Sequence, residues 1–548
     1  MKDNFCILIA FVAATLCCQS QSISVAGTIL EDAVWSADTV LVTDDLFVPD
    51  TVRLTIEPGV IVLVSRRKAI RVRGALVAQG SMEAPIRFSA RDTLYNSDTT
   101  SFLGTWEGLH FLDMNSHNDS SILDYCILEH GGAYGPAHID RYGGGIFVRN
   151  SSNIRISNSV IRNNYAQWGG GGIYLTENSS ILIKDNIIRN NACGNEGGGI
   201  MSGEGCSPRI TGNLIIENLA TKFVQAFPGF YGYNGRGGGV CISTLTEERP
   251  PQVIGNVVCN NFSSSGGGIY ESSFETHIVS NIVANNRGTG LFIGVSISGS
   301  YVLNNTVCNN LGIGISGLLS NNLSIRNNIF HNNQHHYLQV LVDTMDILYD
   351  MDMPERVFSY NNVGTASDDL GPNTIANLVP IGEGNISTLP QFVGGSAGAG
   401  LAYSGYEADW RLAMGDAGID AGNAADVLDI LPETDVYGGD RIQGMAIDMG
   451  AVEYDPTVSV ATPSKEESAV GIYPNPFSGQ VWIELKNALP TNWDLLIWNE
   501  QGQLMASHQL SGSLVGLPTN GFPAGVYFFE GKSKDGQRLF MRKMVKGK

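Results

Sequence analysis

One pattern, Ile/Val-x-x-Asn-x-Ile/Val-x-x-Asn, recurs through the middle of the chain and restricts its fold more than any other feature. The final asparagines of the seven copies are 27, 27, 43, 25, 24 and 23 residues apart. A period near 25 residues, with apolar residues at two-residue spacing, fits a coil of three short strands and three turns rather than a helix pair. The copies span 156–164 (with Ser159 in the first polar place), 183–191, 210–218, 253–261, 278–286, 302–310 and 325–333 (with Phe330 in an apolar place).

Stacking of these coils explains the asparagines. Successive coils in parallel sheets lie about 4.8 Å apart, so equivalent residues form rows. An asparagine at the same turn of every coil can hydrogen-bond the side-chain amides above and below it and the turn backbone. We therefore expect Asn191 to lie beside Asn164 and Asn218, and we interpret the repeated asparagines as structural rather than ligand-binding residues.

Blocks of glycine precede an apolar strand residue in five coils. Ordering glycine loses more entropy than ordering any other residue, so the blocks need a structural reason. We expect a row of residues without Cβ atoms, which permits positive φ and close contact between layers. We also expect this row to leave a trough on the outer surface. The blocks are 143–145, 169–172, 197–199, 237–239 and 266–268.

These motifs resemble the right-handed parallel β-helix family, the pectate-lyase-like solenoids, over roughly residues 25–450. The stretch "LTIEPGVIVLV" and the later "WEGLHF" and "LDYCILEHGG" are similar to the first coils of bacterial surface proteins of this kind. Residues 418–454 resemble the closing segment called choice-of-anchor Q. The resemblance implies a fold and not a chemistry.

The predicted fold class is all-β, a right-handed parallel β-helix solenoid followed by a small antiparallel Ig-like β-sandwich. Composition agrees, because 66 glycines and only 16% charged residues indicate strands and turns rather than helices. The predicted divisions are a signal peptide at 1–20, an N-terminal cap with the first coils at 23–120, regular repeats at 121–335, an irregular closing segment at 336–454, a linker at 455–470 and a C-terminal domain at 471–548.

Charge and the N-terminal residues restrict partners and compartment. The formal net charge of −20 repels phosphate backbones, so nucleic acid is not an expected partner. The apolar run 5–18 is too short for an ordinary transmembrane helix and suits the core of a signal peptide, with cleavage after Ser20. Lipid attachment at the Cys17-Cys18 pair is an alternative. No other segment is long and apolar enough to span a membrane.

Six cysteines follow the predicted cleavage site, and their pairing is open because six thiols allow 15 connectivities. Cys259 and Cys308 occupy the same place two coils apart, about 9.6 Å, which is too far for a disulfide. Cys193 and Cys206 remain a possible pair across one loop.

The variable segments between each asparagine turn and its glycine block must emerge along one edge of the solenoid. Aromatic rings there could stack on sugar rings, so we predict a polysaccharide-binding surface. The alternative is that the rings fold onto the solenoid's own flank as a satellite cluster. The predicted ligand-binding residues are Tyr134, Tyr142, Tyr165, Trp168, Phe227, Phe230, Tyr231 and Tyr233.

Catalysis at the same edge is a second hypothesis. A polysaccharide lyase needs a base and a cation or metal at the uronate, and a glycosidase needs two carboxylates, for which Asp140 and Glu196 are the pair available. The chain has no motif of a known lyase or pectinase subfamily. The candidate catalytic residues are His138, Asp140, Tyr142, Glu196 and Arg236.

No metal site or cofactor is predicted, with Ca²⁺ as an alternative on a group of aspartates in the closing segment. These aspartates lack the spacing of known calcium loops, and turn capping suffices to explain them. They are Asp416, Asp420, Asp435, Asp440 and Asp448. Arg162 and Arg189 should stack in one outward column, which we interpret as a solvated face.

The last 78 residues alternate strand-like and turn-like segments and predict a small β-sandwich. They resemble the type A C-terminal sorting domain of the type IX secretion system of Bacteroidetes. The resemblance implies recognition by the outer-membrane translocon, passage across the outer membrane, and often removal of the domain with attachment to the cell surface. The residues that carry it are Tyr473, Pro474, Asn475, Pro476, Phe477, Gly525, Tyr527, Lys543, Val545 and Lys546.

The sequence therefore predicts a secreted or cell-surface β-helix protein, exported by the type IX route, that binds polysaccharide or another surface ligand along its loop-lined edge. A polysaccharide lyase or glycoside hydrolase acting at that edge and a structural spacer or adhesin are the alternatives.

Overall fold

The computed structural model describes most of the chain from Gln21 onward, so the predicted signal peptide lies outside the described residues. The described residues are 21–92, 105–114, 120–135, 137, 139–221, 223–227, 230–233, 235–244, 249–294, 299–316, 323–333, 357–363, 382–425, 427–456, 470–473, 477, 479–485, 492–499, 503–511, 514–519, 521–523, 525–534 and 538–546.

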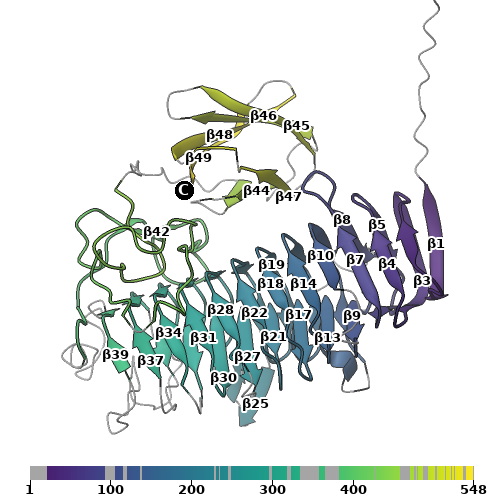
Figure 1. The fold of residues 1–548 in the computed structure, drawn as a ribbon, viewed down its shortest axis with the longest axis horizontal. Helices are drawn as coiled ribbons and strands as arrows, with labels where there is room; N and C mark the ends of the chain where they lie inside the picture. Colours follow the sequence, from purple (N-terminus) through teal and green to yellow (C-terminus); the bar gives the residue numbers. More distant parts are fainter. Residues whose placement is uncertain are drawn as a thin grey trace, which may run out of the picture.

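The chain winds into a solenoid of stacked coils, with a separate β-sandwich lying over one side of it (Figure 1). Strands in successive coils pair in parallel, as in Ile146↔Ile173 and Ile173↔Ile200. The one helical element among the described residues is the short 3-10 turn η1 (Ile139–Arg141). The predicted all-β class with a right-handed parallel β-helix is confirmed.

Each coil contributes to two long sheets. One sheet has 12 strands in register, and the other has 22 strands in two arms that share β3. The 12-stranded sheet contains β2 (Ala33–Trp35), β4 (Arg53–Ile56), β7 (Ala75–Gln79), β10 (Ser121–Asp124), β14 (Ile154–Ser157), β18 (Leu182–Lys184), β22 (Arg209–Thr211), β28 (Gln252–Ile254), β31 (His277–Val279), β34 (Tyr301–Leu303), β37 (Ser324–Arg326) and β39 (Val357–Ser359).

We call the arm that starts each coil after a glycine block the glycine arm, and the arm before each asparagine pair the flank arm. The glycine arm contains β3 (Thr39–Val48), β6 (Ile70–Val72), β9 (Leu109–Leu112), β13 (Ile146–Arg149), β17 (Ile173–Thr176), β21 (Ile200–Ser202), β27 (Val240–Thr244), β30 (Ile269–Ser273), β33 (Leu291–Ile293) and β36 (Ile315–Ser316). The flank arm contains β1 (Ser22–Thr28), the shared β3, β5 (Ile61–Val64), β8 (Ile86–Ala90), β11 (Cys126–Glu129), β15 (Val160–Arg162), β19 (Ile187–Arg189), β23 (Leu214–Ile216), β29 (Val257–Cys259), β32 (Ile282–Ala284), β35 (Thr306–Cys308), β38 (Ile329–His331) and β40 (Asn362–Val363).

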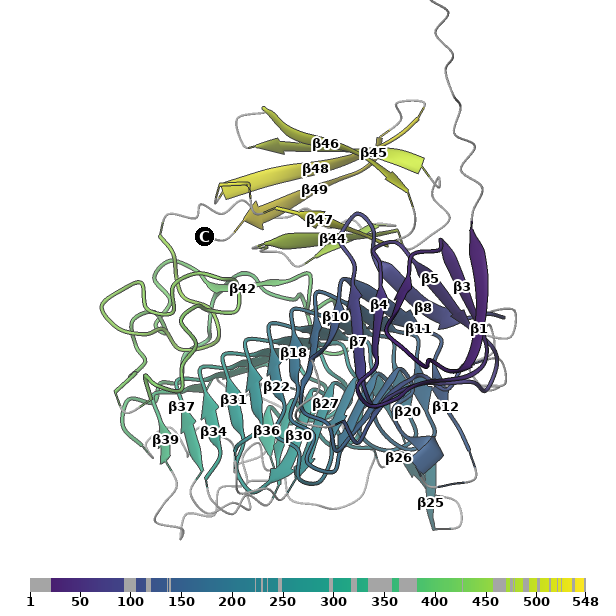
Figure 2. The ribbon, with the colours of Figure 1, turned by 45° about the vertical axis from the view of Figure 1, so that its right-hand side comes forward.

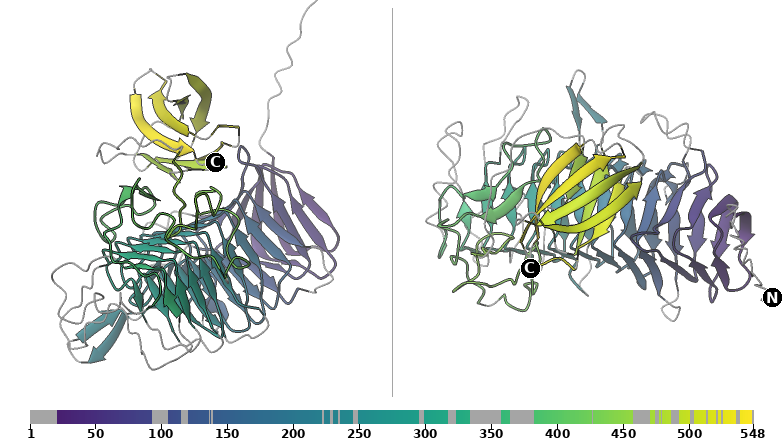
Figure 3. Two further views of the ribbon diagram at one scale, coloured as in Figure 1. Left: turned by 60° about the vertical axis from the view of Figure 1, so that its left-hand side comes forward. Right: turned by 90° about the horizontal axis from the view of Figure 1, so that it is seen from above.

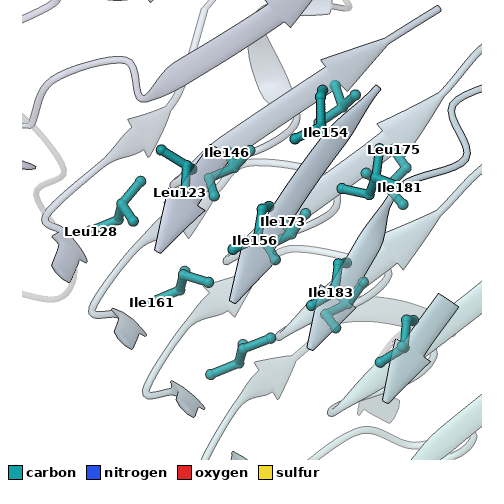
Figure 4. Packing of buried hydrophobic residues seen from close by; sticks show 14 of the residues in the cluster. Leu123, Leu128, Ile146, Ile154, Ile156, Ile161, Ile173, Leu175, Ile181 and Ile183 are labelled. Atoms are coloured by element: carbon teal, nitrogen blue, oxygen red, sulfur yellow. The ribbon is translucent and has the colours of Figure 1, made fainter. Parts of the chain in front are cut away.

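Alternate residues of all three faces point into one apolar core that runs along the solenoid axis. Ile156, Ile161, Ile173 and Ile183 are fully buried there, and their side chains meet inside the coils (Figure 4). Because every coil repeats the same inward pattern, the core is continuous from coil to coil.

The predicted asparagine stacking is confirmed. Asn191 donates from Nδ2 to Asn218 Oδ1 at 3.0 Å and accepts from Asn164 Nδ2 at 2.9 Å. The first asparagines of the repeat form a second ladder, which continues past the predicted end of the regular repeats through Asn361 to Asn385. The buried amides therefore satisfy one another and the turn backbone in every coil.

The predicted close packing at the glycine blocks is also confirmed, but the trough is wrong. Gly170 has φ +66°, and a Cβ there would lie 2.5 Å from the Tyr174 Cβ. A Cβ at Gly144 would lie 2.3 Å from the carbonyl oxygen of Tyr165. Every residue of the five blocks is buried, because neighbouring turns fill the space that the missing side chains leave.

One outward row of the flank arm is apolar and is covered by the chain's own later residues. Val160, Ile187 and Leu214 stack in register, and the closing segment packs Tyr406, Trp410 and other side chains over this face. In the closing segment, β41 (Phe392–Gly394) pairs with β42 (Asp409–Leu412), which Figure 1 shows beside the solenoid.

Turn asparagines attach this covering layer. Asn260 donates to the Tyr403 carbonyl at 2.7 Å, and its Oδ1 accepts from the Gly405 N–H at 2.9 Å. Asn285 donates to the Gly398 carbonyl at 2.8 Å. The closing segment therefore lies back along the flank.

The C-terminal residues form the predicted antiparallel sandwich, seen above the solenoid in Figures 2 and 3. One sheet contains β43 (Val470–Tyr473), β44 (Gln480–Leu485) and β47 (Leu514–Pro518), and the other contains β45 (Asn492–Asn499), β46 (Leu504–Ser511), β48 (Gly525–Ser533) and β49 (Arg538–Lys546). Phe477, Trp493 and Phe529 lie in its core. Most of the predicted linker lies outside the described residues.

The six cysteines after the predicted cleavage site are free and buried. Cys259 and Cys308 flank Ala284 in one row, two coils apart as predicted. Cys193 and Cys206 do not form the disulfide left open above.

Candidate functional site

The loop edge is built by four two-residue strands and one projecting hairpin. The short strands are β12 (Gly132–Ala133), β16 (Tyr165–Ala166), β20 (Ala192–Cys193) and β24 (Leu219–Ala220). The hairpin strands are β25 (Phe223–Phe227) and β26 (Phe230–Tyr233). Figure 2 shows the hairpin at the bottom of the solenoid, away from the sandwich.

Residues of the loop edge alternate between a buried and a half-exposed row. Ala133, Ala166, Cys193 and Ala220 form a buried cluster. The outward row contains Tyr165, Ala192, Leu219, Phe262, Arg287 and Leu311 in consecutive coils. We call these six residues the loop-edge row.

The predicted ligand-binding rings do not share one environment. Tyr134 is 54% exposed. Tyr165 and Trp168 are half-buried. Tyr142 is buried and stacks on Tyr174 with ring centroids 4.5 Å apart, so its ring is not an open platform.

The hairpin residues Phe227, Phe230, Tyr231 and Tyr233 lie in strands, but their side chains are outside the described set. The structure therefore gives the hairpin's position and leaves the role of its rings a prediction.

A second row of rings, which the sequence analysis missed, follows the outside of the glycine arm. Phe147, Tyr174 and Tyr270 belong to it, in register with Met201 and Cys241 between them. Tyr270 stacks on Phe292 of the next coil at 4.8 Å. The available signal was that the second residue after a glycine block is repeatedly aromatic.

The candidate catalytic residues are largely engaged with other groups. Glu196 accepts from Arg236 at 3.1 Å, and the Arg236 guanidinium also lies over the Tyr270 ring. Burial, with the nearby Tyr174 and Glu196, raises the pKa of Tyr142, which opposes its use as a base at neutral pH. Asp140 is exposed, and His138 lies outside the described residues.

The aspartates considered for Ca²⁺ mostly accept backbone N–H groups. Asp435 accepts from Tyr437, Gly439 and Glu453, and Asp416 accepts from Gly418. Within the described part of the chain, no three His, Cys, Asp or Glu side chains form a group that could hold a metal ion. These contacts explain the aspartates as turn-forming residues, and calcium binding stays an untested alternative.

Residues of the three predicted sorting motifs meet inside the sandwich. The centroids of the Phe477 and Tyr527 rings lie 6.1 Å apart. The Lys546 ammonium lies 5.7 Å from the centroid of the Phe477 ring. Tyr527 donates to the Pro523 carbonyl at 2.7 Å. Residues from three segments that are distant in sequence thus pack together in the domain.

The remaining sorting residues are described only in part. Pro474, Asn475 and Pro476 lie outside the described residues. Gly525 begins β48, and Lys543 and Val545 lie in β49 without described side chains. Tyr473 is fully buried, and it faces the solenoid rather than the sandwich core.

Comparison with known families agrees with this geometry. Residues 89–244 match the right-handed β-helix region, and residues 471–546 match the secretion system C-terminal sorting domain. No curated protein matches the chain.

The chain is thus a right-handed β-helix protein that carries a type IX sorting domain after the solenoid. This domain directs it to the cell surface or to secretion and implies contact with the type IX machinery. Over the described residues, no helix has the length and apolar character needed to cross a membrane.

Proposed function

We propose that this exported β-helix protein binds a linear polysaccharide along the loop-edge row. The observation that carries the proposal is the placement of Tyr165 and Phe262, which are half-buried and share one outward row. They stand three coils apart, about 14 Å, with Ala192 and Leu219 between them. Two rings with apolar side chains between them suit a polymer whose sugar faces recur along its length.

Polar groups at both ends of the row support the same ligand class. Tyr134 is exposed and follows β12, the strand that pairs with the strand of Tyr165, so its hydroxyl can bond a sugar hydroxyl. The exposed Arg287 lies with its guanidinium 4.5 Å from the Phe262 centroid, where it can also meet a uronate carboxylate. No described contact favours catalysis, because Glu196 and Arg236 neutralise one another and Tyr142 is buried.

Affinity electrophoresis of the full chain against neutral and uronic-acid polysaccharides tests the proposal. Tyr165→Ala and Phe262→Ala should each weaken binding about three- to tenfold, since each removes one stacking ring. Tyr301→Ala is the matched control, because Tyr301 is a half-buried ring on the 12-stranded sheet. No retention on any polysaccharide favours the spacer hypothesis, and equal losses in all three variants contradict the assigned surface.

The same incubations separate binding from catalysis. Formation of unsaturated product or new reducing ends, abolished by Tyr142→Phe or Arg236→Ala, would establish the lyase or hydrolase alternative instead.

A further inference from the structure

Arg189 does not lie on the solvated face that its column predicted. Its neighbour in the row, Arg162, is bonded to Glu129 within the solenoid. Arg189 is only 6% exposed, and its Nη1 donates to the Tyr473 hydroxyl of the sorting domain at 2.8 Å and to the Glu484 carboxylate. The prediction of a solvated face at Arg189 is therefore wrong, because the sorting domain covers it.

The solenoid supplies a second carboxylate to the same guanidinium. Glu217, one coil further on, accepts from Arg189 Nη2 at 2.7 Å. Glu217 has φ +58° at a turn where neighbouring coils place Asn190 and Asn260. A glutamate in the left-handed region is less favourable than asparagine, and here its carboxylate pairs with Arg189.

The closing segment completes the site. Tyr406 donates its hydroxyl to Glu217 at 3.3 Å, and its ring meets that of Tyr473 edge-to-face at 5.7 Å. Trp482 of the sorting domain also packs against this cluster. Burying a charged arginine is costly unless it is paired and hydrogen-bonded. Here the sorting domain and the solenoid bond the two Nη atoms of Arg189, and the closing segment bonds Glu217 through Tyr406.

We propose that the flank surface formed by Arg189, Glu217 and Tyr406 is a docking site for the sorting domain, which holds that domain against the folded solenoid. The site exists only when two coils have stacked and the closing segment has docked on them. The position of the sorting domain therefore depends on completed folding of the cargo, and the docked form conceals Tyr473, the first residue of its N-terminal sorting motif. This inference does not rest on polysaccharide binding.

Small-angle X-ray scattering of the full chain tests the docking. Arg189→Gln and Glu484→Gln should increase the undocked population about tenfold or more and enlarge the maximum dimension, because each leaves a buried polar partner unpaired. Arg162→Gln is the matched control, since it alters the same row within the solenoid. Circular dichroism should show that the variants keep the solenoid's strand content.

Tyr406→Ala tests the dependence on the closing segment. This variant leaves Arg189 and Glu484 in place. It should increase the maximum dimension of the molecule as Arg189→Gln and Glu484→Gln do. Wild-type dimensions in Arg189→Gln and Glu484→Gln, or equal enlargement by Arg162→Gln, would overturn the docking site. Wild-type dimensions in Tyr406→Ala alone would overturn the dependence on cargo folding.

Discussion

The flank and the loop edge arise from the same coils, yet the chain treats these two outward surfaces differently. The flank rows are covered by the closing segment and the sorting domain, whereas Tyr165, Phe262 and Arg287 of the loop edge remain partly or fully exposed. The repeat thus specifies the interior, while the outward residues decide which surface is covered. The edge left accessible is the better place for a ligand.

Removing Trp410, a large ring of the closing segment that packs on the flank, should expose the flank and reduce the difference between the two surfaces. Trp410 is 2% exposed and donates to the Gly405 carbonyl at 2.8 Å. Trp410→Ala should destabilise the closing segment's packing on the flank by about 3–5 kcal/mol and speed maleimide labelling of Cys259 and Cys308 by about a hundredfold or more. Peptide mass spectrometry identifies the labelled thiols.

Trp168→Ala on the loop edge provides the comparison for this experiment. It should leave Cys259 and Cys308 protected, because Trp168 lies in a turn of the loop edge and not in the closing segment that packs on the flank. Unchanged labelling of both thiols in Trp410→Ala would show that the closing segment does not protect the flank.

The interior could be predicted from the sequence because each coil presents the same local environment. The contacts of Asn191 followed from the equivalent asparagines one period away, and the burial of the inward isoleucines followed from the two-residue alternation. The prediction of a trough was wrong because it needed a contact that the glycine spacing does not specify. Glycine spacing predicts close approach, but it does not say that the backbone of Tyr165 fills the space over Gly144.

The covered flank could not be predicted, because its contacts join residues that no period relates. Arg189 and Glu484 are 295 positions apart, and alternation marks Arg189 only as outward-facing. Glu217 was a usable signal, since it interrupts a column of asparagines in left-handed turns. The polysaccharide predicted for the loop edge stays a prediction, because a fold does not specify a chemistry.

The interior beneath both surfaces contains one carboxyl that should make stability depend on pH. Glu271 is buried, accepts from the Ser273 N–H at 2.9 Å, and burial raises its pKa from an ordinary value near 4.5 to about 7. The folded chain keeps this proton at pH values where the unfolded chain has lost it. Stability should therefore fall as pH rises from about 4.5 through 7, by at most about 3 kcal/mol.

Urea denaturation at several pH values measures this loss, and Glu271→Gln is its control. The amide does not titrate, so the difference in unfolding free energy between the two proteins should change over that pH range. A constant difference would mean that Glu271 is already ionised in the folded chain.

The smallest effect is expected on the loop edge, and it sharpens the comparison with Trp410. Arg287 is exposed, and its guanidinium lies over the Phe262 ring at 4.5 Å. Arg287→Gln removes one exposed cation–π contact and should lower the unfolding free energy by no more than about 1 kcal/mol. Its backbone bonds to the adjacent coils remain, since they do not involve the side chain. If urea denaturation instead shows a loss as large as that in Trp410→Ala, the edge is held as firmly as the flank. The contrast between a covered structural surface and an accessible binding surface would then fail.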